Sequence, residues 1–113
     1  MKVKDLCEKL GLTQLSGCTA ESLENEIEGC YIGDLLSWVM GRASENDVWI
    51  TVMGNINAIA VASLTGCACI VLSEDAVLDA DAKAKSDALS IPVLSSSKPA
   101  YPLAVGVSEL IGK

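Results

Sequence analysis

The sequence contains no histidine and no phenylalanine, and Arg42 is its only arginine. Without histidine, the chain can form neither a Ser-His-Asp or Cys-His triad nor a histidine-ligated metal site. The glycine-rich phosphate loops of ATP-hydrolysing and dinucleotide-binding proteins are also missing. These absences predict a protein that is not an enzyme and has no catalytic residues. A reaction that uses Asp34 or Asn55 with Ser37 is the remaining enzymatic alternative.

Positive charge is scarce throughout the chain. Its 113 residues include 8 Lys and Arg against 15 Asp and Glu, which gives a net charge of −7. Proteins that bind nucleic acid neutralise phosphates with clustered Lys and Arg, so this acidic chain is predicted not to bind nucleic acid. Half of the residues are hydrophobic, which is enough to build a core.

One long segment lacks charge, because residues 48–73 include no Asp, Glu, Lys or Arg. The run is longer than the roughly 20 residues of a membrane helix. It is interrupted by Gly54, Asn55, Asn57 and Gly66, and its first part is β-branched whereas its middle is rich in alanine. This pattern predicts a strand, a buried helix and a second strand, with no membrane partner.

The first ten residues alternate charged and apolar side chains, which is unlike the apolar core of a signal peptide. We therefore expect a cytoplasmic protein whose thiols stay reduced. The five cysteines form no CxxC pair, and their spacing predicts small buried side chains with no metal site and no cofactor. They are Cys7, Cys18, Cys30, Cys67 and Cys69.

Hydrophobic spacing and turn residues predict an alternation of strands and helices. Helices are expected over residues 3–10, 35–40, 55–64 and 79–89, with a last one after Pro99. Gly11 is expected to end the helix over 3–10. Asp34 is expected to cap the start of the helix over 35–40, whose buried stripe would consist of Leu35, Leu36, Val39 and Met40. Strands are expected over 12–15, 27–32, 47–53, 68–72 and 91–94. A solvated connection over 19–28 is expected to link the first two strands.

This order predicts the fold class. Alternating strands and helices with buried strands form a mostly parallel sheet with right-handed crossovers. We expect residues 1–113 to form one small α/β sandwich domain in which helices flank the sheet. The helix over 55–64 is apolar on nearly every side, so it either lies deep in the fold or meets a second subunit.

Three strand-to-helix turns are candidate ligand sites, because ligands of open α/β sheets bind beyond the carboxyl ends of the strands. The first turn has a glycine and two asparagines, and the others are rich in serine. Capping of the following helices is the alternative role for these side chains. The candidate ligand-binding residues are Gly54, Asn55, Asn57, Ser73, Ser95, Ser96 and Ser97. The nearby acidic residues 74, 75, 79 and 81 match no cation-binding loop.

The segment Gly29–Met40, followed by Trp49–Met53, Asn57–Ala62 and Ile91–Leu94, resembles DRTGG-domain proteins. These are related to the N-terminal domain of HPr kinase/phosphorylase, and the resemblance, over about residues 12–113, is nearest to small stand-alone proteins associated with iron-only hydrogenase genes. It implies a small α/β sandwich, frequent dimers and a regulatory or accessory role without the separate kinase domain. The sequence departs from the family at Gly54-Asn55, where Gly-Asp-Arg is common and no arginine follows.

Together these features predict a non-catalytic regulatory or accessory domain. We expect a homodimer that either senses a small ligand or binds a partner protein. The alternative is a cysteine-based metal or iron–sulfur accessory protein linked to hydrogenase.

Overall fold

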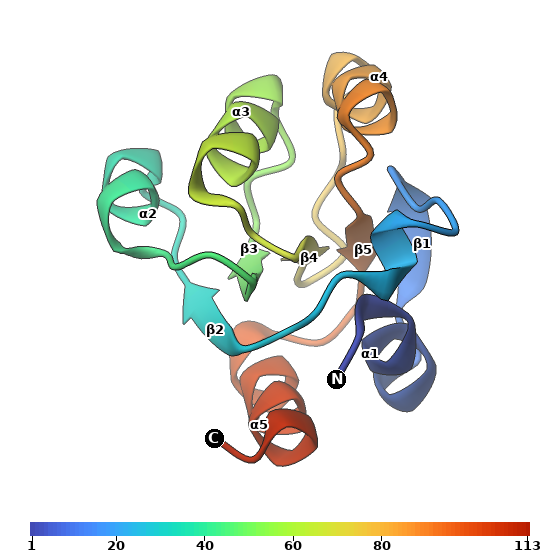
Figure 1. The fold of residues 1–113 in the computed structure, drawn as a ribbon. Coiled ribbons are helices and arrows are strands. Elements are labelled where there is room, and N and C mark those ends of the chain that lie inside the picture. The colour runs from blue at the N-terminus through green and yellow to red at the C-terminus, as the bar shows by residue number, and fades with distance from the viewer.

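A computed structural model describes all 113 residues, which form an α/β domain (Figure 1). Five strands build one sheet in the order β1-β5-β4-β3-β2. Strands β2 to β5 are parallel, and β1 pairs antiparallel with β5. Helices α2, α3 and α4 cover one face of the sheet, and α1 and α5 cover the other. The elements are α1 (Val3–Leu10), β1 (Thr13–Ser16), η1 (Ser22–Glu24), β2 (Gly29–Ile32), α2 (Leu36–Arg42), β3 (Asp47–Thr51), α3 (Ile56–Thr65), β4 (Cys69–Leu72), α4 (Ala80–Leu89), β5 (Val93–Ser95) and α5 (Ala100–Ile111).

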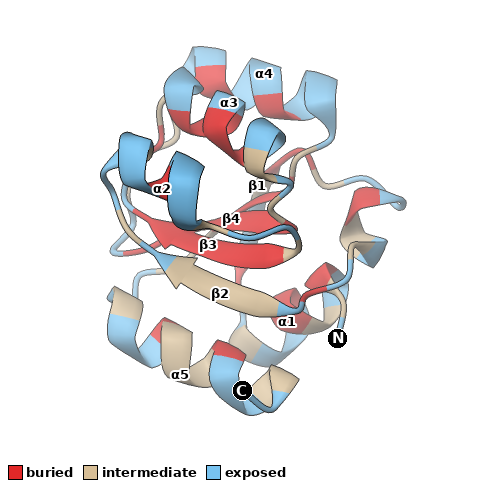
Figure 2. Ribbon diagram, turned by 60° about the vertical axis from the view of Figure 1, so that its left-hand side comes forward, coloured by how far each residue is buried: buried red, intermediate tan, exposed pale blue.

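The centre of the sheet is fully buried, and it separates two hydrophobic clusters (Figure 2). Every residue of β3 and β4 is buried, as expected for strands covered by helices on both faces. Trp49 lies in the cluster under α2, α3 and α4, and its indole N–H donates to the Gly33 carbonyl at 2.9 Å. This confirms the predicted α/β fold with a mostly parallel sheet.

Helix α1 follows its sequence pattern closely. Val3, Leu6 and Cys7 are buried on one face, and Gly11 ends the helix in the left-handed conformation with φ of 63°. The connection over 19–28 was expected to be solvated, and its four glutamates are exposed, but it also contains the 3₁₀ helix η1 with buried Ser22. Hydrogen bonds hold this segment in place: the Ser22 hydroxyl donates to the Gly17 carbonyl at 2.7 Å, and the Val3 N–H donates to the Asn25 carbonyl at 3.0 Å.

The uncharged segment divides into β3, α3 and β4. Helix α3 is the middle one of its layer and packs between α2 and α4. Its buried residues face the sheet, while Asn57, Ala60 and Ser63 are exposed. The fold therefore covers the inner side of α3, whereas Ile56 and Leu64 on the rest of the helix are 38% and 73% exposed. That a second subunit covers this outer side stays a prediction. None of the helices has the length and apolarity to cross a membrane.

Helix α2 differs from the sequence prediction. Of the expected stripe only Val39 is buried, whereas Leu35 and Met40 are exposed. The reason is the position of α2 over β2, the last strand of the sheet, where no further helix flanks it. Asp34 was expected to cap this helix, but Leu35 is the N-cap residue. The helix consequently leaves apolar side chains in solvent next to an open strand.

Candidate functional site

The structure places the three candidate turns beside one another. They follow β3, β4 and β5, which are neighbours in the sheet, so the turns meet at its carboxyl edge. Backbone hydrogen bonds join them, since Glu74 donates to the Lys98 carbonyl and Asp75 to the Ser96 carbonyl, both at 2.9 Å. The turns therefore form one connected surface, as expected from the topology.

Two of the candidate residues are enclosed within this surface. Gly54 is buried, and its carbonyl accepts a hydrogen bond from the Asp79 N–H at 2.8 Å. A Cβ at Gly54 would lie 1.9 Å from the Val77 carbonyl oxygen, so the glycine is needed for contact between two loops of this chain. Ser73 is 3% exposed, and its N–H donates to the Thr51 carbonyl.

The asparagines and the other serines have different roles. The Asn55 side chain accepts from the Ala58 N–H at 2.9 Å and caps α3, which confirms the capping alternative for this residue. Asn57 is exposed on the first turn of the helix. The Ser96 hydroxyl accepts from the Lys98 N–H, Ser95 is half-buried at the end of β5, and Ser97 is exposed. Of the candidate residues, Asn57 and Ser97 thus offer exposed side chains to a ligand.

Asp34, which was expected only as a helix cap and in the enzymatic alternative with Ser37, organises the same edge. The Asp34 carboxylate accepts from the Thr51 hydroxyl at 2.8 Å and from the Val52 N–H at 3.0 Å. It thereby joins the turn after β2 to the end of β3. Only the neighbouring positions of β2 and β3 in the sheet bring these residues together, so local sequence carries no signal for this contact.

The acidic residues after β4 are not gathered into a cluster of potential metal ligands. Glu74 and Asp75 both adopt left-handed backbone conformations, with φ of 57° and 55°. No group of three or more Cys, Asp or Glu side chains is placed to hold a metal ion anywhere in the chain. The metal-based alternative therefore has no assembled ligand set.

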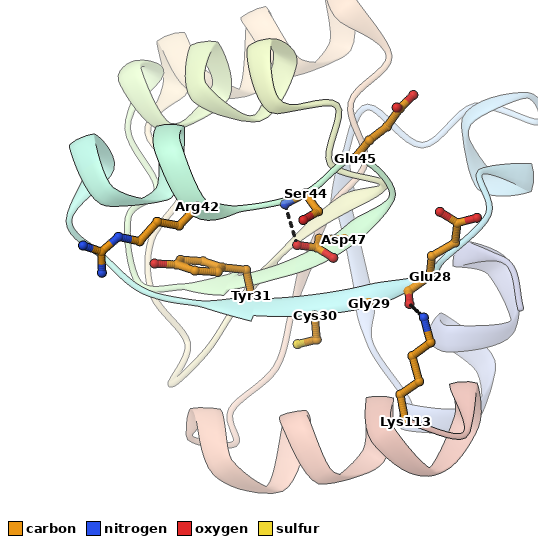
Figure 3. Close-up of a pocket in the computed structure, with 9 residues that line it drawn as sticks. All are labelled: Glu28, Gly29, Cys30, Tyr31, Arg42, Ser44, Glu45, Asp47 and Lys113. Carbon is orange, nitrogen blue, oxygen red and sulfur yellow. Dashed lines mark hydrogen bonds between the residues drawn. The ribbon is translucent and has the colours of Figure 1, made fainter.

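Both cavities of the molecule lie at the other end of the sheet, beside the amino end of β2. The larger one, of about 460 Å³, is polar and lies on the α2 side of the strand (Figure 3). Its side chains include Tyr31, Arg42 and Asp47, and the Asp47 carboxylate accepts from the Ser44 N–H at 2.8 Å. The smaller cavity, of about 250 Å³, lies between β2 and α5 and is lined by Gly29, Cys30, Ala104, Val107, Ser108, Ile111 and Lys113.

Both cavities share part of their lining. Gly29, Cys30 and Lys113 line both, and the Lys113 ammonium donates to the Glu28 carbonyl at 2.9 Å. Sequence reasoning missed this region because it depends on β2 being the outer strand, which no local pattern reveals. Two sequence features could have drawn attention to this region: Arg42 is the only arginine, and Tyr31 is an aromatic residue within a short predicted strand.

The thiols are free and poorly suited to ionise. Burial raises the pKa of Cys7 and of Cys30 to about 11, and it raises the pKa of fully buried Cys69 well above its ordinary value. Burial is also the main cause of the raised pKa of Cys18 and Cys67. Because the thiolate is the reactive and metal-binding form, these cysteines are held in their inert state near neutral pH.

No protein-family model matches the chain, and no curated protein is significantly similar to it in sequence.

Proposed function

We propose that this domain is a non-catalytic regulatory or accessory module of the cytoplasm that works as a homodimer. One observation carries the proposal: large apolar side chains are exposed along β2 and α2, beside the open edge of the sheet. Ile32 is 50% exposed, Leu35 58%, Trp38 53% and Met40 41%. Arg42 stacks on Trp38, with its guanidinium carbon 3.8 Å from the ring centroid.

Such an exposed apolar surface is unusual for a monomeric protein. A run of exposed apolar side chains next to unpaired backbone groups favours association, because it buries apolar area and completes hydrogen bonds at once. A surface that pairs with its own copy forms an isologous interface, the commonest arrangement in soluble oligomers. The resemblance to regulatory DRTGG domains agrees with this proposal, since it too implies dimers without kinase activity.

A matched pair of substitutions tests the dimer. Leu35→Ser removes an apolar side chain from the proposed interface, and serine is a favourable N-cap residue, so α2 is preserved. Leu89→Ser removes a 43% exposed leucine at the end of α4, which packs near β1 at the opposite side of the sheet. Light scattering should show a weaker dimer for Leu35→Ser and an unchanged one for Leu89→Ser. The proposal would be refuted if both variants dimerised equally well, or if the parent protein were monomeric.

The dimer would present two copies of the carboxyl edge to a small ligand or a partner protein. The observation that supports a ligand is the exposure of Asn57 and Ser97 on adjoining turns. A thermal-shift screen with nucleotides, phosphorylated metabolites and divalent metals tests this role, because a ligand of the native state raises its stability. A shift that Asn57→Ala or Ser97→Ala abolishes would place the ligand there. Absence of any shift would instead favour a partner protein.

A further inference from the structure

The outer strand β2 has a backbone pattern that specifies how a second copy can join it. Its partner strand β3 lies on one side only, in a register that pairs Tyr31 with Trp49. Gly33 donates its N–H to the Ile50 carbonyl of β3. Because residues of a strand alternate in direction, the N–H and C=O groups of Tyr31 face β3, whereas those of Cys30 and Ile32 face outward.

The row of β2 backbone groups that face away from β3 ends near the start of the strand. The regular alternation ends at Glu28, whose N–H donates to the Asn46 carbonyl at 3.0 Å and whose carbonyl accepts the Lys113 ammonium at 2.9 Å (Figure 3). Only Cys30 and Ile32 therefore have both backbone groups free for another strand. In a two-fold arrangement, these groups are all used when Cys30 of each copy lies opposite Ile32 of the partner subunit.

The side chains fit the same register. Cys30 belongs to the cluster on the α5 side of the sheet, and Ile32 points to that side too because side chains alternate. Next to Cys30 lies the 250 Å³ cavity whose wall includes Val107 and Ile111. Opposite Cys30, the half-exposed Ile32 of the partner subunit would enter this apolar cavity.

We propose that two copies pair through antiparallel β2 strands, with Tyr31 at the two-fold axis and each Ile32 in the cavity between β2 and α5 of the other copy. This inference rests on the proposed dimer and names its interface. The two sheets then form one continuous ten-stranded sheet, which is twice the five strands of one copy. The pairing covers the open edge of β2, while β1 stays the outer strand at each end of the combined sheet.

The contact must be large enough for a stable pair. A standard interface buries about 800 Å² on each partner, which would be roughly one seventh of the 5586 Å² surface of this domain. The paired strands alone are too short for that. The exposed side chains of Leu35, Trp38 and Met40, on the helix above β2, extend the contact on the Tyr31 side.

Site-directed crosslinking tests the register. At the axis, the two copies of residue 31 form a non-hydrogen-bonded pair with Cα atoms about 4.5 Å apart, within reach of a disulfide. Tyr31→Cys in a Cys30→Ser background should therefore give a covalent dimer on mild oxidation. Native Cys30 should crosslink far more slowly, because the two Cys30 side chains lie diagonally, about 7–8 Å apart.

Hydrogen exchange tests the same arrangement without substitution. The amides of Cys30 and Ile32 should exchange at least about ten-fold more slowly when the concentration is raised from the monomeric to the dimeric range. The Tyr31 amide, already bonded to β3, should change little. Fast exchange at Cys30 and Ile32 in a dimeric sample, or preferential crosslinking through Cys30, would overturn the interface while leaving the dimer intact. A sample that stays monomeric would instead overturn the proposed function itself.

Discussion

Replacement of Gly54 tests whether the first candidate turn is a packing contact of the chain with itself. In Gly54→Ala, the new Cβ would lie 1.9 Å from the Val77 carbonyl oxygen and 2.8 Å from its carbonyl carbon. Both are backbone atoms, so the loop between β4 and α4 must move. The move also strains the hydrogen bond from the Asp79 N–H to the Gly54 carbonyl.

Overpacking of this kind costs about 1–3 kcal/mol, and we expect the upper end because backbone rather than a flexible side chain must yield. A loss of about 3 kcal/mol lowers the Tm of a domain of this size by roughly 12 °C. The free energy of unfolding is measured by urea denaturation, with Gly41→Ala as the control. A Cβ at Gly41 meets no atom within 4 Å, and alanine should stabilise α2 by about 0.5–1 kcal/mol. A Gly54→Ala protein as stable as the parent would refute the reasoning.

Three further predictions concern capping, pH and thiol chemistry. Asn55→Ala should cost about 1 kcal/mol, measured by urea denaturation, because it removes the side-chain cap of α3. Hydrogen bonding to Lys2 is the main cause that lowers the pKa of Glu24 to about 2, against an ordinary value of 4.5. The stabilisation from Glu24 should therefore be complete above pH 4.5 and lost as pH falls towards 2, so Glu24→Gln should lower the Tm at pH 7 but not at pH 2. Native protein should react slowly with a thiol reagent at pH 7.5, Cys69 slowest of all, whereas urea-unfolded protein should label at every cysteine; rapid labelling of Cys69 in the native state would contradict its burial.

Much of the fold could be predicted because its signals are local. The spacing of Val3, Leu6 and Cys7 with Gly11 at the end predicted α1 to the residue, and the uncharged run divided into β3, α3 and β4 at its glycines and asparagines. Buried strands alternating with helices predicted the parallel sheet. These features depend on neighbours in sequence, which a single chain displays directly.

The parts that could not be predicted depend on the order of the strands. The apolar residues of α2 were expected in the core, but Leu35 and Met40 are exposed because α2 covers the outermost strand. The cavities beside Cys30 require that β2 be an edge and that α5 return beneath it. Likewise, the Asp34 contact with Thr51 joins residues that are distant in sequence and adjacent only in the sheet.

The central claim is that the domain works as a homodimer, and its mass in solution tests this most directly. Light scattering of the reduced protein from micromolar to millimolar concentration should show a mass approaching twice 11.8 kDa. Leu35→Ser should shift that transition to higher concentration. A mass of 11.8 kDa over the whole range would contradict the account.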